Sequence, residues 1–271
     1  MIHILRFMKV LITLFFTSIL IFSCANEKQE IVVENFKEVP KKIIVEEVDS
    51  IELEITRIAR TIITNRNAKE RLLKYADTVK LNRIVVYTKY GKMKFKLYSN
   101  TPMHRANFVL LSNKKVFDNT LFYRIIDEFM IQGGNSESET IRTKLNAVGN
   151  YRIPNEISSK NIHKKGALAM AVPTEEQDFE KKSSQINFYI IEGKVLPKSY
   201  FDIQRSDKKK FNSKQISTYT TKGGAPHLDG DYTVFGEMTS GFGVLSKISK
   251  IKVDKYKWPL RDVVIDSIRA F

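Results

Sequence analysis

A single arginine, Arg124, stands among aromatic and aliphatic residues in the stretch FYRIIDEFMIQGG, residues 122–134. Arginine keeps its proton at ordinary pH and carries five N–H donors in a fixed plane. It can therefore serve as an electrostatic clamp, but it cannot serve as a general base. The two glycines that end the stretch remove side chains, which allows close approach of a backbone or a bulge. The stretch predicts a surface that works through fixed positive charge.

Two strands in this stretch would bring a small set of side chains together. If its two halves are adjacent antiparallel strands, side-chain alternation places Arg124 near Met130 and Gln132 on one face. Phe129 would flank that face. From these residues alone, a buried arginine that merely satisfies carbonyls or pairs with a carboxylate is an equal alternative.

Other catalytic patterns are missing from the sequence. It has no Walker loop, no dinucleotide-binding glycine fingerprint and no Gly-x-Ser-x-Gly elbow. His104, His163 and His227 are too far apart in the sequence for a local metal motif, and we interpret them as surface or packing residues. The acidic runs NSESET and PTEEQDFE are typical of solvated loops. We expect no metal and no cofactor.

The elements that would position Arg124 begin with a period-two pattern in RIVVYTKYGKMKFKLY. Met93, Phe95 and Leu97 fall on one face with lysines on the other, and Gly91 supplies the turn, which predicts an antiparallel hairpin with one solvated face. Further strand-like runs are LFYRII, EFMIQGG, GALAMAV, INFYII, YTVFGEM and DVVIDSI. Short strands in this number favour a mainly β closed barrel or sandwich.

Two helices are predicted inside this β domain. Thr101 as N-cap and Pro102 at the first helical position start one of them in NTPMHRANFVLLSNKK. The second fits GFGVLSKISK. Residues 50–80 predict a helical N-terminal extension, because apolar residues recur there at helical spacing after a capping-box pattern.

Length and charge restrict the remaining possibilities. The chain has 271 residues, 42% of them hydrophobic, and a formal net charge of +15. This length predicts one main domain, residues 81–271, with appendages. The lysines occur in short scattered groups, whereas a nucleic-acid footprint clusters on one face with stacking aromatics, so we expect no nucleic-acid partner. A third, weaker hypothesis is a basic surface protein that binds polyanions.

Residues 1–24 have the pattern of a signal peptide. Arg6 and Lys9 precede the apolar run VLITLFFTSILIFS, which is short for a membrane-spanning helix and ends at Cys24. The stretch IFSC resembles the lipobox of bacterial lipoproteins, which implies that Cys24 is acylated. An uncleaved signal anchor is the alternative. Residues 25–49 mix Glu, Lys and Val without periodicity, as a flexible tether would.

The motifs FYRIIDEFMIQGG, GALAMA, INFYII and HLDGDYTVFGEM occur in the order and spacing of cyclophilin-type peptidyl-prolyl isomerases. The resemblance covers about residues 84–267, and TPMHRANF and KWPLRDVVI agree with it. It implies a closed eight-stranded antiparallel barrel capped by two helices, with the binding groove on the outer face. The lipobox and the long connection before HLDG resemble the exported bacterial branch.

By motif match, the resemblance implies that Arg124 is the catalytic arginine and that Gln132 is the glutamine beside it. The same match implies a proline pocket and a peptide-binding rim formed by Phe129, Met130, Ala171, Val172, Gln185, Asn187, Tyr189, His227, Leu228 and Tyr232. Three positions depart from the family pattern: Asn187 stands for a glutamine, His227 for a tryptophan and Tyr232 for a histidine. Gln185 lies two residues before Asn187 and could replace its contact to peptide.

The sequence therefore predicts an exported peptidyl-prolyl cis-trans isomerase that acts on X-Pro bonds through Arg124 and an apolar pocket. The alternative is a catalytically weak cyclophilin-like module that binds peptides as a chaperone or scaffold. Expected partners are proline-containing segments of exported proteins and the membrane, reached through the lipid on Cys24. We expect a monomer in the cell envelope, on the periplasmic side of the outer membrane, with the cell surface as the alternative.

Overall fold

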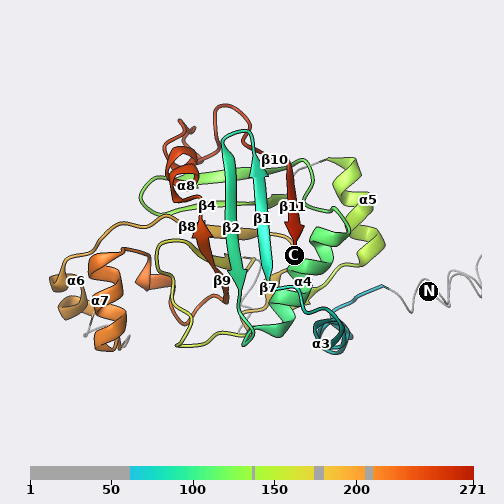
Figure 1. Cartoon of the computed structure of the whole chain (residues 1–271), viewed down its shortest axis with the longest axis horizontal. Coiled ribbons are helices and arrows are strands. Elements are labelled where there is room, and N and C mark those ends of the chain that lie inside the picture. The colour runs from blue at the N-terminus through green and yellow to red at the C-terminus, as the bar shows by residue number, and fades with distance from the viewer. Residues whose placement is uncertain (1–61, 136–137, 174–179, 205–209) are drawn as a thin grey trace, which may run out of the picture. The chain divides into compact units, whose positions relative to one another are not determined.

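Figure 1 shows a computed structural model of the chain, which describes residues 62–135, 138–173, 180–204 and 210–271. The predicted signal peptide, the tether and the start of the helical extension lie outside these residues. Within the described ranges, no helix combines the length and apolar character needed to cross a membrane.

The centre of the fold is an antiparallel sheet of nine strands. They are β1 (Arg83–Thr88), β2 (Gly91–Leu97), β3 (Thr120–Ile126), β4 (Met130–Asn135), β6 (Ala167–Met170), β8 (Phe188–Ile191), β9 (Val234–Ser240), β10 (Val264–Ile265) and β11 (Ser267–Ala270). Their order in the sheet is β10-β3-β4-β8-β6-β9-β2-β1-β11. A separate two-stranded ladder joins β5 (Arg152–Ile153) to β7 (Ser183–Ser184).

The sheet closes into a barrel through its last two strands. β10 pairs with β3 and β11 pairs with β1, and Asp266 alone separates β10 from β11. The backbone N–H of Asp266 donates to the carbonyl of Tyr87 at 2.9 Å. The two ends of the sheet are therefore one strand interrupted at Asp266, which is why nine strands appear where eight were predicted.

Side-chain alternation divides the apolar residues of the sheet into two layers. On β8, Phe188 and Ile190 belong to the core cluster inside the barrel, whereas Tyr189 belongs to a second, outer cluster. On β6, Met170 points to the core cluster and Ala169 to the outer one. Residues buried on both faces are typical of strands covered on both sides. The outer layer is the surface on which the candidate site lies.

Two helices cap the barrel at opposite ends, as the sequence predicted: α4 (Pro102–Asn113) and α8 (Phe242–Ser249) (Figure 1). The described loop segments contain three further helices that the sequence did not predict: α5 (Glu139–Val148), α6 (Lys198–Gln204) and α7 (Ser213–Thr221), besides a short 3-10 helix η3 (Pro226–Leu228). Helix α5 follows β4, and α6 and α7 lie in the long connection after β8. Figure 1 shows α6 and α7 on the opposite side of the barrel from α5.

The helical extension is part of the main core. Its described helix is α3 (Ala68–Thr78), which lies within the predicted range, and residues 62–67 before it are not helical. Ala68, Leu72 and Ala76 are buried and belong to the same continuous core cluster as the residues inside the barrel, with α3 packed on α4. The residues before the helix bind the end of α5, since Ile63 N–H donates to the carbonyl of Val148 at 2.9 Å.

A distant carboxylate, and not the predicted Thr101 hydroxyl, caps the N-terminus of α4. Thr101 occupies the N-cap position but makes no capping hydrogen bond. Instead, the Glu156 carboxylate accepts from the backbone N–H groups of Met103 at 3.0 Å and His104 at 2.9 Å. A carboxylate at this end also interacts favourably with the helix dipole. Glu156 lies 2.7 Å from the Nδ1 of buried His104, whose Nε2 contacts Ser183 Oγ at 3.0 Å.

Candidate active site

A bulge in β3 directs Arg124 out of the barrel. In the β3–β4 register, Phe122 pairs with Gly133 and Arg124 pairs with Gln132, so Tyr123 is an extra residue. Strict alternation from the buried Phe122 would point Arg124 into the core, but a bulge shifts the following side chains to the other face. Arg124 is accordingly exposed and Ile125 is buried. The structure thus excludes the alternative of a buried, carbonyl-satisfying arginine.

The glycine pair of β4 permits this close pairing. A Cβ atom on Gly133 would lie 2.6 Å from the Leu121 carbonyl oxygen and 2.8 Å from the Phe122 ring. A Cβ on Gly134, where φ is +105°, would lie 2.2 Å from the carbonyl oxygen of Ile186. These distances are too short for any other residue. The close backbone approach that the glycines were expected to allow is therefore present, whereas the bulge lies on the partner strand, at Tyr123.

Gln132 connects Arg124 to an aromatic support. Arg124 Nη1 donates to Gln132 Oε1 at 3.3 Å, and Gln132 Nε2 donates to the Tyr123 hydroxyl oxygen at 2.9 Å. The Tyr123 ring lies against Trp258, with 5.9 Å between ring centroids. Because arginine can only donate, it fixes Oε1 of the amide toward itself and Nε2 toward Tyr123. Arg124 forms an ion pair with no carboxylate among the described residues.

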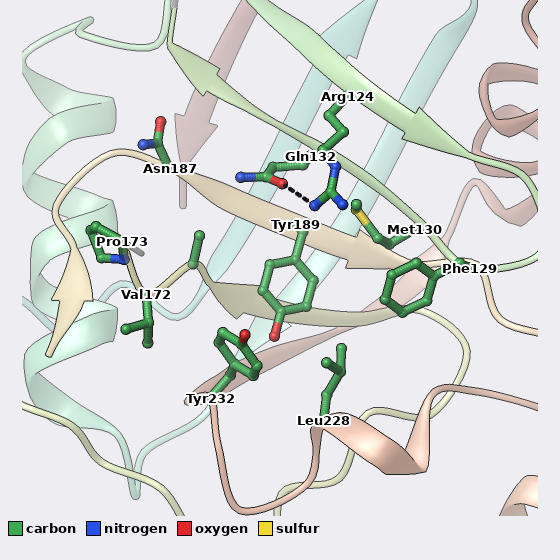
Figure 2. A pocket seen from close by; sticks show the side chains of 11 residues that line it. Arg124, Phe129, Met130, Gln132, Val172, Pro173, Asn187, Tyr189, Leu228 and Tyr232 are labelled. Atoms are coloured by element: carbon green, nitrogen blue, oxygen red, sulfur yellow. Dashed lines mark hydrogen bonds between the residues drawn. The ribbon is translucent and has the colours of Figure 1, made fainter. Parts of the chain in front are cut away.

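A pocket with a volume of about 370 Å³ opens beside the Arg124 guanidinium (Figure 2). It is lined by Arg124, Phe129, Met130, Gln132, Ala171, Val172, Pro173, Asn187, Tyr189, Leu228 and Tyr232. In Figure 2, Phe129 and Met130 lie on one side and Asn187 and Pro173 on the other. The part of the wall formed by Phe129, Met130 and Leu228 is apolar, so an uncharged ring can be desolvated there, close to a fixed cation.

A chain of buried polar groups holds the Tyr189 wall of the pocket. The Tyr189 hydroxyl lies 3.0 Å from His163 Nε2, His163 Nδ1 lies 2.8 Å from Asp229 Oδ1, and the Tyr219 hydroxyl donates to Asp229 Oδ2 at 2.6 Å. Because the carboxylate accepts, Nδ1 carries the proton, and Nε2 of a neutral ring accepts from Tyr189. Tyr232 meets Tyr189 edge-on, with ring centroids 5.9 Å apart. His163 is thus a packing residue, as interpreted from the sequence.

Tyr189 in the pocket wall and Tyr123 beside Gln132 both stay protonated at neutral pH. Burial raises the pKa of Tyr189 well above its ordinary value, and neighbouring Tyr232, Asp229 and Asp231 raise it further. Burial also raises the pKa of Tyr123, although the hydrogen bond from Gln132 and the charge of Arg124 oppose this. The pocket therefore presents the neutral phenol of Tyr189 near a permanent cation, and a second neutral phenol, Tyr123, supports Gln132.

The rim of the pocket contains peptide groups that could meet an extended ligand. Ala171 uses both its backbone groups internally, since its N–H donates to the Asn187 carbonyl at 2.9 Å and its carbonyl accepts from Ser184 at 2.8 Å. The N–H and carbonyl of Val172 form no hydrogen bond with any described residue. The buried Oδ1 of Asn187 likewise has no partner within the described ranges. Val172 therefore has backbone groups that no described residue pairs with, and Oδ1 of Asn187 is unpaired but buried within the described part of the chain.

Two residues assigned from the family pattern lie outside this pocket. The buried Gln185 turns inward, where its Oε1 accepts from the backbone N–H of Tyr151 at 3.0 Å, so the suggestion that it replaces Asn187 is wrong. His227 is exposed and packs on the far side of Phe129, with ring centroids 5.2 Å apart. The other predicted site residues all line the pocket.

The family described as "Cyclophilin type peptidyl-prolyl cis-trans isomerase/CLD" matches residues 83–270. The chain belongs to this family. A Staphylococcus aureus (strain USA300) protein named "Putative peptidyl-prolyl cis-trans isomerase" is 32% identical over 187 residues, which are 69% of this chain and 90% of that protein. A Staphylococcus epidermidis protein of the same name is 30% identical over the same shares of both chains.

Solved cyclophilin structures share the fold. A crystal structure of a cyclophilin type peptidyl-prolyl cis-trans isomerase from Cryptosporidium parvum superimposes with a TM-score of 0.51 at 23% identity, covering 70% of this chain and 98% of that one. A second structure of that protein, in the presence of the dipeptide Ala-Pro, gives a TM-score of 0.50. The predicted mainly β cyclophilin-like barrel is confirmed.

Sequence analysis missed two contributors to this cyclophilin-type site. Tyr123 was not singled out, although a tyrosine between a buried Phe and an exposed arginine is compatible with a bulge. Trp258 was quoted only within KWPLRDVVI, and nothing in the sequence places its ring against Tyr123. No group of three or more His, Cys, Asp or Glu side chains in the described part of the chain is arranged to hold a metal ion.

Proposed function

We propose that the chain isomerises X-Pro peptide bonds by stabilising the twisted amide with the Arg124 guanidinium. The observation that carries this proposal is an exposed cation without a carboxylate partner in the described structure, held by Gln132 at the edge of an apolar pocket. Such an arrangement offers charge stabilisation and ring binding together. It offers no acid, base or nucleophile, and rotation about a bond requires none.

The energetics of the amide explain why a cation is useful. Amide resonance gives a rotation barrier of ~18–20 kcal/mol, so uncatalysed X-Pro exchange takes tens to hundreds of seconds. Twisting the bond localises the lone pair on the proline nitrogen, which becomes a better hydrogen-bond acceptor. A guanidinium directed at that nitrogen stabilises the twisted form more than either planar isomer. Lowering the barrier by roughly 5 kcal/mol gives a rate gain between about 10³ and 10⁴.

The pocket walls support binding of the ring and of the flanking peptide. Phe129, Met130 and Leu228 provide an apolar surface that fits a proline side chain, as Figure 2 illustrates. The free backbone groups of Val172 can pair with an extended peptide. Asn187 lines the pocket on the side away from Phe129. The C. parvum protein of similar fold was also crystallised in the presence of the dipeptide Ala-Pro, a compound of the proposed substrate class.

The decisive experiment is a comparison of Arg124→Ala with the native chain on a proline-containing peptide. We expect kcat/KM to fall by about 10²–10³, the usual effect of removing one preorganised donor, with an unchanged circular dichroism spectrum. Arg142→Ala, at an exposed arginine on α5, is the matched control and should keep full activity. An Arg124→Ala variant as active as the control would refute the role of the arginine.

A catalytically weak peptide-binding module is the second candidate. It is favoured by Asn187, whose side chain is one methylene shorter than glutamine, and by His227, which leaves the pocket without a large apolar wall on that side. A proline-peptide isomerisation assay run beside an aggregation-suppression assay separates the two candidates. Suppression without isomerisation would support the module.

We also propose that the chain is exported and held in the cell envelope by a lipid on Cys24. The charged start, apolar run and IFSC stretch of residues 1–24 support this location, and the clients would then be proline-containing segments of other exported proteins. Labelling with a fatty-acid analogue should mark the native chain and spare Cys24→Ala. Equal labelling of both would contradict the anchor.

A further inference from the structure

A second cavity lies next to the proline pocket and shares one wall with it. This side pocket, with a volume of about 300 Å³, is bounded by Phe129 on the side of the proline pocket and by Leu196 and Tyr200 on the other. Phe129 lines both cavities. A peptide bound over Phe129 can therefore place one side chain in each, because consecutive Cα atoms are about 3.8 Å apart.

The outer wall of the side pocket is built by the long connection after β8. Leu196 is fixed by its backbone N–H, which donates to the carbonyl of Tyr219 at 3.1 Å. Tyr200 meets Phe201 with ring centroids 5.1 Å apart, and Phe201 stacks on Tyr219 at 6.1 Å. The packing of α6 on α7 therefore holds an apolar and aromatic wall opposite Phe129.

Two carboxylates stand at the mouth of the side pocket. Asp127 and Glu128 occupy the β3–β4 turn, and Glu128 has a φ of 58°. Its N–H donates to Glu192 Oε2 at 3.0 Å, which fixes the turn in this strained conformation. Asp127 makes no ion pair with any residue that the structure describes. The lining thus contains two carboxylates and a single lysine, Lys194.

Lys194 neutralises this charge only weakly. Its Nζ donates to Glu128 Oε2 at 3.2 Å, and the two side chains are 60% and 63% exposed. Exposed pairs of this kind contribute between about 0 and 1 kcal/mol, so a ligand cation can displace the lysine at small cost. The mouth of the side pocket keeps a net negative charge.

We propose that the side pocket binds a lysine or arginine side chain of the substrate, one to three residues from the proline. The inference rests on the proposed function and adds a sequence preference to it. The methylene stem lies along Phe129, Leu196 and Tyr200, and the cationic end reaches Asp127 and Glu128. Long basic side chains bury their stems on apolar surface while the charge stays hydrated, and the aromatic faces add cation–π attraction.

The test uses proline peptides that carry lysine, norleucine or glutamate at each of three positions on either side of the proline. At one position, we expect kcat/KM for lysine to exceed that for norleucine by about two- to fivefold at low salt, with glutamate below both. The lysine-to-norleucine ratio should fall toward one in Asp127→Asn/Glu128→Gln. It should rise in Lys194→Gln, which frees Glu128. Glu70→Gln, on the exposed side of α3, is the matched control and should leave the ratio unchanged.

Two results would overturn the inference: equal rates for lysine and norleucine at every position, or a lysine preference that survives in Asp127→Asn/Glu128→Gln. A norleucine preference at one position would make the side pocket an apolar subsite instead. Equilibrium binding of the same peptides to Arg124→Ala measures the preference without catalysis. If the native chain binds lysine peptides selectively but does not isomerise them, the proposed function is refuted and the side pocket assignment stands.

Discussion

Gln132 faces Arg124 across the β3–β4 pair, and its Oε1 accepts from Arg124 Nη1 at 3.3 Å. The other end of the same amide donates to the Tyr123 hydroxyl at 2.9 Å. The guanidinium is therefore oriented by two neutral side chains, Gln132 and Tyr123, and keeps its full charge. A carboxylate in place of Gln132 would neutralise the cation on which the proposed mechanism depends.

Tyr123→Phe should weaken catalysis without altering the fold. The change removes the acceptor of Gln132 Nε2 and frees the amide to turn, so Arg124 is held less well. We expect kcat to fall by about three- to tenfold, equivalent to one hydrogen bond, while KM changes little. Steady-state kinetics with a proline peptide measures both. Trp258→Phe keeps a ring against Tyr123 and should show a smaller loss. If Tyr123→Phe has native kcat, the hydrogen bond between Tyr123 and Gln132 does not position Arg124 for catalysis.

Tyr189→Phe should act mainly on stability. It deletes the hydroxyl that bonds buried His163 and keeps the ring that lines the pocket. We expect a loss of about 0.5–1.5 kcal/mol in the free energy of unfolding, measured by urea denaturation, with activity per folded molecule retained. Tyr232→Phe is the matched control, because its hydroxyl bonds no described residue. Similar effects in the two variants would show that the His163 contact contributes nothing.

Leu72→Ala should show that α3 belongs to the folding unit of the barrel. The side chain is fully buried, at 0% exposure, and belongs to the core cluster inside the barrel. We expect a loss of about 2–5 kcal/mol in the free energy of unfolding. Lys74→Ala, at an exposed position on the same helix, should change it by less than about 0.5 kcal/mol. Unfolding of Leu72→Ala in two separate transitions, with the barrel transition unmoved, would contradict this view.

The isomerisation rate should be flat between about pH 6 and pH 9. Arg124 stays protonated throughout this range. The pKa values of Tyr123 and Tyr189 are raised above 10.0, so both phenols also stay neutral throughout. Exchange rates measured by NMR in buffers of constant ionic strength provide the check. A bell-shaped profile would indicate acid-base chemistry, and its loss in His227→Asn would locate the titrating group beside Phe129.

Period-two alternation placed Arg124, Met130 and Gln132 on one face, and the structure brings all three to the pocket. However, Arg124 shares this face for a different reason than simple period-two alternation. Counted from Phe122, strict alternation points Arg124 inward, and the extra residue Tyr123 reverses its direction. No local pattern announces such a bulge, because it depends on the pairing of two strands. The glycines were the available signal.

The errors concern side chains whose direction is set by distant partners. Gln185 lies two residues before Asn187 and was expected to be able to contact peptide, but its Oε1 accepts from the backbone N–H of Tyr151 inside the fold. Thr101 sits at the predicted helix start, yet Glu156, more than fifty residues later, provides the cap. The helices of the long loops were missed because their helical stretches are short and polar. Such features follow from tertiary contacts, which a single sequence does not display.

The interruption at Asp266 means that one strand completes the ring, and this strand follows all the others along the chain. As the polypeptide emerges, β1 and β3 expose unpaired edges until Val264–Ala270 arrives to join them. During most of its synthesis, the protein therefore exposes strand edges that can pair with other polypeptides. An enzyme proposed to help other chains fold thus itself needs its exposed strand edges protected from aggregation until its own barrel closes.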